Sequence, residues 1–328
     1  MPSTATVAPK TTVVHGGDLG GVFQRFPRAP KPWIDLSTGI NPVPYPLPPL
    51  PDAAWTRLPS RAAEAALLDA AAARYGVPSR AMIVAAPGTQ ALIQVLPRLV
   101  PRGRVAIVGP TYEEHQACWS RAGHDVRVVP TLEDADVVVT VNPNNPTGRQ
   151  FSPAELSKTK GLLVVDEAFI DFLPREMSLA GDLPERAVVL RSFGKTYGLA
   201  GLRLGFAIAH RGIANRIREE LGPWPVSGPA LEIGRRALND GAWLRVAHER
   251  LVADSARLDG VLRAAGFEIA GGTLLFRLAC HPSAAIVAQR LGEQGIHVRA
   301  FADAADQLRF GLPGSDEAFR RLAGALGV

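Results

Sequence analysis

Seven short apolar runs, separated by segments with helical character, constrain the fold of this 328-residue chain more than any other feature. Runs of this kind are typical of parallel strands that are buried on both faces and joined by covering helices. We therefore expect an α/β fold with a mostly parallel seven-stranded sheet. The runs span residues 81–86, 104–108, 125–129, 136–141, 161–165, 187–190 and 204–209.

The flanking segments suggest how the rest of the chain is organised. Prolines cluster over residues 36–59, which predicts an extended connector without helix or central strand. Residues 61–75 are rich in alanine and precede Gly76, so they predict a helix. A long amphipathic helix over 242–265, followed by strands at 267–269, 274–278, 296–299 and 307–310, predicts a smaller α+β domain. We expect an N-terminal arm that joins the small domain (1–45), a large domain (46–238) and the small domain (239–328).

Composition argues against several classes of protein. The net charge is +5, but the basic residues are scattered among acidic ones, so we expect no nucleic-acid partner. Cys118 and Cys280 stand far apart and form no metal-binding pattern, which favours a reducing compartment. The chain shows neither a signal peptide nor a membrane-spanning segment, and we expect a cytoplasmic protein without a membrane partner.

One lysine stands out. Only five of the 36 Lys and Arg residues are lysines, and Lys195 is the sole lysine in the second half of the chain. It lies in the glycine-rich segment 191–205, directly after an apolar run. Burial there would disfavour the ammonium and prepare Lys195 to act as a Schiff-base amine. An exposed lysine in a loop is the alternative.

Two further polar segments follow apolar runs. Residues 142–148 read NPNNPTG, and Asp166 begins the sequence DEAF. In an open α/β sheet, ligand-binding loops lie at the carboxyl ends of the strands. Asp166 would need a cationic partner there, and a protonated pyridine nitrogen is one possibility. The alternatives are an ordinary turn at 142–148 and a helix cap at Asp166.

The order and spacing of NPNNPTG, DEAF and SFGKTYGLAGLRLG resemble the fold type I pyridoxal-phosphate enzymes of the class I/II aminotransferase superfamily. The resemblance implies a homodimer that uses pyridoxal 5′-phosphate. It also implies that Lys195 binds the cofactor covalently, that Asp166 keeps the ring nitrogen protonated and that Asn145 donates to the phenolic oxygen.

The same resemblance implies a binding site for the cofactor phosphate. Ser192 and Arg203 match its ligands, and a guanidinium suits a phosphate because it binds in a bidentate manner and stays charged. The loop with Gly88, Thr89 and Gln90 matches the segment that offers backbone N–H groups to the same phosphate.

Two more residues are assigned by resemblance. Tyr112 matches the aromatic residue stacked on the pyridine ring, with a buried core tyrosine as the alternative. Arg309 matches the arginine that binds the substrate α-carboxylate, for which a fork-shaped donor is well suited.

The N-terminal segment narrows the resemblance. His15-Gly-Gly, followed by DLSTGINP at 35–42, is similar to the threonine-phosphate decarboxylases of cobalamin biosynthesis, which are relatives of histidinol-phosphate aminotransferase. The similarity implies that Gly39, Ile40 and Asn41 lie over the substrate carboxylate and that His15 lies near the substrate phosphate. A histidine without a role is the alternative for His15.

Two positions depart from the pattern of the relatives. Phe169 replaces a tyrosine that contacts the ring oxygen, so one hydrogen bond is lost. Leu58 replaces a tyrosine that reaches the cofactor phosphate of the neighbouring subunit, which leaves that contact without a donor here.

We therefore expect a lyase that decarboxylates L-threonine O-3-phosphate, a small phosphorylated amino acid, to (R)-1-amino-2-propanol O-2-phosphate. The alternatives are an aminotransferase of the histidinol-phosphate type and a non-catalytic cofactor-binding module. The sequence does not identify the ligands of the substrate phosphate, nor a residue that distinguishes threonine phosphate from serine phosphate.

Overall fold

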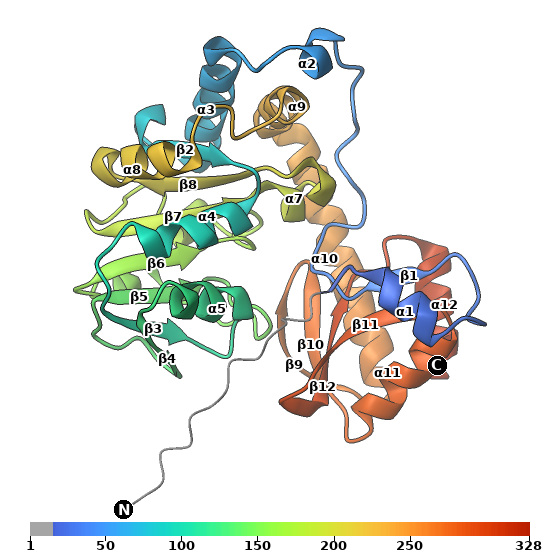
Figure 1. Cartoon of the computed structure of the whole chain (residues 1–328). Helices are drawn as coiled ribbons and strands as arrows, with labels where there is room; N and C mark the ends of the chain where they lie inside the picture. Colours follow the sequence, from blue (N-terminus) through green and yellow to red (C-terminus); the bar gives the residue numbers. More distant parts are fainter. Residues whose placement is uncertain (1–15) are drawn as a thin grey trace, which may run out of the picture.

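The computed structural model describes residues 16–328, which form two sheets with helices packed against them (Figure 1). The larger sheet contains seven strands in the order β2 (Ile83–Ala86), β8 (Gly205–Ala209), β7 (Ala187–Ser192), β6 (Leu162–Asp166), β5 (Val137–Val141), β3 (Arg104–Val108) and β4 (Asp125–Val129). Strand β8 runs antiparallel to both of its neighbours, whereas the other pairs are parallel. The expected α/β fold with a mostly parallel seven-stranded sheet is confirmed.

Apart from the edge strand β4, the strands of the larger sheet are buried because helices cover both of its faces. Val138 and Leu163 belong to an apolar cluster that includes residues of α3 (Arg61–Tyr75) and α9 (Gly228–Asn239). Their chain neighbours Val139 and Val164 belong to a second cluster, with residues of α4 (Thr89–Val95), α5 (Glu113–Arg121) and α8 (Arg211–Leu221). This alternation explains why the strands read as continuous apolar runs.

The smaller sheet has five strands in the order β1 (Ile34–Leu36), β11 (Ile296–Phe301), β12 (Ala304–Gly311), β10 (Phe276–Cys280) and β9 (Glu268–Thr273). Its apolar face packs with α10 (Gly241–Ala264), α11 (Ala284–Glu293) and α12 (Asp316–Leu326). Figure 1 shows α10 leading from the side of the larger sheet to the smaller one. The N-terminal strand β1 thus joins a sheet whose other strands follow residue 267.

The remaining helices are short: α1 (Leu19–Arg25), α2 (Ala53–Thr56), α6 (Pro153–Leu156) and α7 (Phe193–Thr196). Helix α2 contradicts the expectation of a connector without helix, and it forms because Ala53–Thr56 lie in the proline-free stretch between Pro51 and Pro59. The helix predicted over 61–75 is confirmed, with Ser60 as its N-cap and Gly76 in the left-handed conformation at its end. Within residues 16–328, no helix combines the length and the apolar character needed to cross a bilayer.

Candidate active site

The carboxyl ends of three neighbouring strands carry the polar residues of the site. Asp166 is the last residue of β6 and is paired with Val141, the last residue of β5. Asn145 follows β5, and Ser192 is the last residue of β7. Because these strands are parallel, the three polar residues lie along one edge of the larger sheet.

Lys195 follows β7 on the short helix α7, and its amine lies 5.3 Å from the centre of the Phe169 ring. Burial lowers the pKa of Lys195, and the positive charges of Arg309 and Arg203 act in the same direction, whereas Asp166 opposes them. The surroundings therefore favour the neutral, nucleophilic form of this amine.

Asp166 is held by two contacts inside the protein. Its Oδ1 accepts a hydrogen bond from the backbone N–H of Ala168 at 3.1 Å, and its Oδ2 lies 3.1 Å from Nε2 of His115. Sequence reasoning missed His115, although His115 follows Tyr112 by three residues at the start of α5. That spacing places two side chains on one face of a helix and was the available signal.

A compact cradle lies near Lys195, where the loop after β2 meets the start of β8. It consists of Gly88, Thr89, Arg203 and Gly205. Gly88 has φ +84°, and a Cβ atom there would lie 2.7 Å from Nη2 of Arg203. A Cβ atom at Gly205 would lie 2.6 Å from the backbone N of Thr89, and Gly205 is paired with Ser192 in the sheet. Arg203 itself has φ +55°, which is uncommon for a residue with a side chain and typical of functional sites.

Gln90 and Tyr112 form a linked pair at the start of the neighbouring helices. The Tyr112 hydroxyl donates to Oε1 of Gln90 at 3.2 Å, and Nε2 of Gln90 donates to Oε2 of Glu114 at 2.8 Å. Partial burial, together with the charges of Glu114 and Asp166, raises the pKa of Tyr112 to about 12. The Gln90 side chain is thus engaged with its neighbours, so its backbone N–H is the group left to face a phosphate.

Arg309 reaches the site from β12 of the smaller sheet. Its Nη1 donates to Oδ1 of Asn145 and its Nη2 donates to the carbonyl of Ser37. Within residues 16–328, the buried Nε of Arg309 has no hydrogen-bond partner. Burial and the nearby charge of Arg299 lower the pKa of Arg309 to about 10.

Residues 39–41 lie between the two sheets. A Cβ atom at Gly39 would lie 2.9 Å from the rings of both Phe169 and Phe276, and the partly buried Ile40 follows this glycine. Asn41 is fully engaged with the protein: its backbone N–H donates to the Lys195 carbonyl and its Nδ2 donates to the Thr196 carbonyl, both at 2.9 Å. Asn41 thus fixes the turn that carries Lys195. His15 lies outside the described residues.

A second arginine stands next to Arg309, and sequence reasoning missed it. Arg299 of β11 pairs directly with Arg309 of β12, so both side chains lie on the same face of the antiparallel pair. The register of two strands decides this proximity, and no local pattern in the sequence signals it. The two guanidinium groups bring positive charge to this face, and the nearby carboxylate of Asp35 offsets part of it.

The arrangement fits pyridoxal 5′-phosphate. The cradle around Gly88 offers backbone N–H groups, a hydroxyl and a guanidinium to a phosphate. The guanidinium of Arg203 can lie this close to the loop because Gly88 has no Cβ atom. The buried Lys195 amine suits an aldehyde, and the ionisable Asp166 suits a protonated ring nitrogen. The unpartnered Nε of Arg309 suits a substrate carboxylate.

Comparison with known proteins agrees with this geometry. The family described as aminotransferase class I and II matches residues 52–326. A threonine-phosphate decarboxylase from Pseudomonas aeruginosa is 44% identical over 325 residues, covering 95% of this chain and 96% of that protein. One from Sinorhizobium sp. is 44% identical over 331 residues, covering 96% of this chain and 97% of the other. The structure of histidinol-phosphate aminotransferase from Sinorhizobium meliloti in complex with pyridoxal-5′-phosphate has a TM-score of 0.80 at 21% identity, covering 99% of this chain and 97% of that one. The chain belongs to the aminotransferase class I and II family.

Proposed function

We propose that this chain is a pyridoxal-phosphate-dependent lyase that converts L-threonine O-3-phosphate to (R)-1-amino-2-propanol O-2-phosphate and carbon dioxide, a step of cobalamin biosynthesis. One observation carries the proposal: 44% identity to two threonine-phosphate decarboxylases extends over at least 95% of this chain. The match thus includes the N-terminal segment with Gly39 and Asn41 as well as the strand ends.

Each part of the cofactor is bound by a different set of residues. Ser192, Arg203 and the backbone at Gly88, Thr89 and Gln90 bind its phosphate. Asp166 keeps the ring nitrogen protonated, Asn145 donates to the phenolic oxygen, and Tyr112 packs on the ring. When bound, the cofactor supplies an electron sink for the bond that breaks at the substrate Cα.

Arg309 and Lys195 act on the substrate itself. Arg309 binds the α-carboxylate and orients the bond between Cα and the carboxylate carbon, which breaks as carbon dioxide leaves. The electron pair of that bond stays with the amino acid part, and the Lys195 ammonium then donates a proton to Cα. The low pKa that burial imposes on Lys195 suits a group that must exchange protons readily.

We place the phosphate of the substrate beside Arg299. Arg299 is the cation next to Arg309 on the same face of β11 and β12, and a substrate with two anionic groups needs two such partners. The two adjacent guanidinium groups repel one another, and an anionic substrate stabilises both.

Two incubations separate this function from its nearest alternative. Threonine phosphate supplied without any 2-oxo acid should release carbon dioxide. An aminotransferase would release none, and would instead transfer the amino group of histidinol phosphate to 2-oxoglutarate. That second outcome would overturn the proposal.

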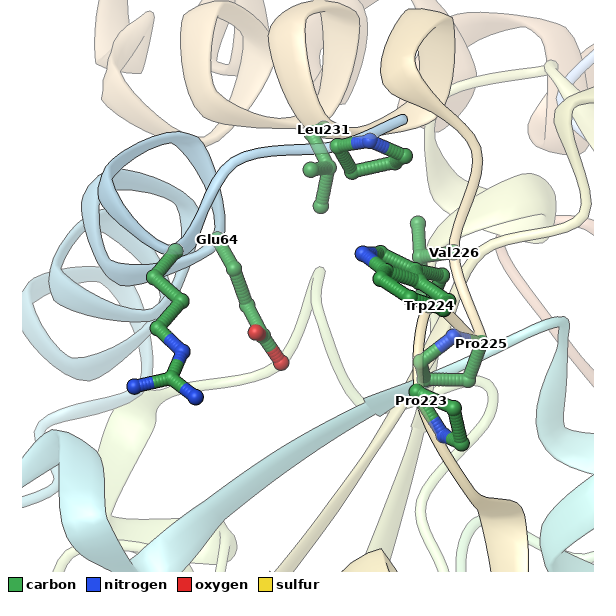
Figure 2. A pocket seen from close by; sticks show the side chains of 8 residues that line it. Glu64, Pro223, Trp224, Pro225, Val226 and Leu231 are labelled. Atoms are coloured by element: carbon green, nitrogen blue, oxygen red, sulfur yellow. The ribbon is translucent and has the colours of Figure 1, made fainter. Parts of the chain in front are cut away.

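A second copy of the chain is the partner that fits its exposed apolar surface. Trp55 and Leu58 are 68% and 69% exposed, and the segment that carries them borders a cavity of about 280 Å³ at Pro59. Figure 2 shows Trp224, which is 57% exposed, beside this cavity. Large apolar side chains gathered at one place are typical of a subunit interface.

The homodimer is tested by light scattering after size-exclusion chromatography. Leu58→Asp should give a monomer, whereas Ile286→Asp, at an equally exposed site on α11, should leave the dimer intact. A monomeric wild-type protein would contradict the assignment.

Both cysteines are free, which agrees with a cytoplasmic enzyme.

A further inference from the structure

A buried ionic network lies behind the site, and the mechanism above does not use it. We propose that Glu167, Asp171 and Arg191 form a positioning group that holds the reactive amine of Lys195 in place through Thr196. The inference rests on the assignment of Lys195 as the cofactor-binding lysine. It concerns how the protein places that lysine, whatever the substrate.

Arg191 is the centre of the network. Its Nη1 lies 3.1 Å from Oε2 of Glu167, its Nη2 donates to Oδ1 of Asp171, and its guanidinium carbon lies 4.3 Å from the centre of the Tyr75 ring. All three ionic side chains are at least 94% buried. Ser178 donates to Oε2 of Glu167 at 2.6 Å, so the carboxylate is fully engaged.

Each member of the network is coupled to a residue of the site. Glu167 follows Asp166 and Arg191 precedes Ser192 in the chain. Oδ2 of Asp171 accepts a hydrogen bond of 2.6 Å from the hydroxyl of Thr196, the residue after Lys195. The network therefore links the end of β6, the end of β7 and the turn that carries the amine.

Stability alone gives little reason for this arrangement. Two carboxylates and one guanidinium lose their hydration here, and burial raises the pKa of Glu167 even though Arg191 lowers it. Buried ion pairs of this kind are often no more stable than well-packed apolar residues of the same volume. What such groups provide is a fixed geometry, and the atom that they fix is the Thr196 hydroxyl.

Two substitutions at Thr196 isolate the hydroxyl. Thr196→Val keeps the shape and removes the donor to Asp171, whereas Thr196→Ser keeps the donor and removes a methyl group. Ser255→Ala is the matched control, because it removes another buried hydroxyl bond, to the Val252 carbonyl on α10, away from the site. Asp171→Asn keeps the size of the acceptor and removes its charge, and it serves as a second variant if Thr196→Val does not fold.

Four quantities should be measured for each variant: the Kd of the apoprotein for pyridoxal 5′-phosphate, from quenching of tryptophan fluorescence; kcat; KM; and the urea midpoint of unfolding. Thr196→Val should raise the Kd and lower kcat by about tenfold each, the loss expected when a hydrogen bond to a charged group is removed. KM should stay within about twofold, because Arg309 and Arg299 bind the substrate independently. Asp171→Asn should change the Kd in the same direction.

Rescue by serine is the decisive result. Thr196→Ser should behave like the wild type in Kd and kcat, and Ser255→Ala, which also loses a buried hydroxyl bond, should keep both at their wild-type values. A wild-type Kd in Thr196→Val or Asp171→Asn, or a Thr196→Ser variant as impaired as Thr196→Val, would overturn the positioning role. If the wild type binds the cofactor but releases no carbon dioxide from threonine phosphate, the proposed reaction fails while the Kd comparison still decides this inference.

Discussion

Nε2 of His115 lies 3.1 Å from Oδ2 of Asp166, and the two residues are only 1% and 4% exposed. Because the other carboxylate oxygen accepts a hydrogen bond from the Ala168 N–H, the protein restrains both oxygens of Asp166. A carboxylate held in this way keeps its orientation toward a partner at the edge of the sheet.

Replacing His115 with phenylalanine should weaken the hold on Asp166. The ring volume is retained, but Oδ2 loses its partner, so we expect the Kd for pyridoxal 5′-phosphate to rise about tenfold and kcat to fall by a similar factor. His124→Phe is the matched control, because His124 is also buried and its ring contacts the Pro97 carbonyl at 2.9 Å, the Gly103 N–H at 3.3 Å and the ring of Trp119. Equal Kd values for the two variants, measured by fluorescence titration, would contradict the role of His115.

Arg299→Gln should impair recognition of the substrate phosphate. We expect the KM for L-threonine O-3-phosphate to rise about tenfold or more, since one charge-assisted contact is lost. With unphosphorylated L-threonine, the two enzymes should have the same kcat/KM, because Arg299 has no phosphate to bind. Arg290→Gln, on the exposed side of α11, is the control. An equal loss of kcat/KM with both substrates would contradict the role of Arg299 in binding the substrate phosphate.

Gly148→Ala should disturb the packing of the loop after β5 against β9 of the smaller sheet. Gly148 has φ +73°, and a Cβ atom there would lie 2.1 Å from the carbonyl oxygen of Gly272 at the end of β9. We expect a loss of about 2 kcal/mol or more in the free energy of unfolding, from strain and overpacking. Gly201→Ala, with open space around its Cβ position, should change the free energy by only a few tenths. Urea denaturation of the apoproteins gives the comparison.

The buried amine of Lys195 predicts a pH dependence of stability. Burial lowers the pKa of Lys195 from its ordinary value of 10.5, so unfolding takes up a proton between the lowered pKa and 10.5. In that interval the free energy of unfolding of the apoprotein should rise with pH, relative to Lys195→Met, by up to about 1.4 kcal/mol per pH unit. Urea denaturation from pH 7 to 10 measures the difference. Parallel curves for the two proteins would show that burial does not shift this pKa.

Much of the fold could be predicted from the sequence, because buried parallel strands leave continuous apolar runs. Asp166, Asn145 and Ser192 could be placed at one edge for the same reason: each lies at or just beyond the end of such a run, and parallel strands share an edge. The short helix α2 is not evident from the sequence, because its four residues lie in a brief proline-free stretch between Pro51 and Pro59.

Partners that meet through tertiary packing could not be predicted. The contact of Arg299 with Arg309 depends on the register of an antiparallel pair, and the contact of Asp171 with Thr196 depends on how a loop folds back on β7. The rotation of α5 decides that His115 faces Asp166. The relationships of Arg299 and Asp171 leave no local pattern in the sequence, whereas the three-residue spacing from Tyr112 is a signal for His115.

The central claim is that the chain removes the carboxylate of a phosphorylated amino acid. It is tested by incubating the enzyme and pyridoxal 5′-phosphate with carboxyl-labelled L-threonine O-3-phosphate, without a 2-oxo acid, and trapping labelled carbon dioxide. We expect one carbon dioxide for each 1-amino-2-propanol O-2-phosphate formed, and none with Lys195→Ala. No labelled carbon dioxide from the wild type, or full activity in Lys195→Ala, would contradict it.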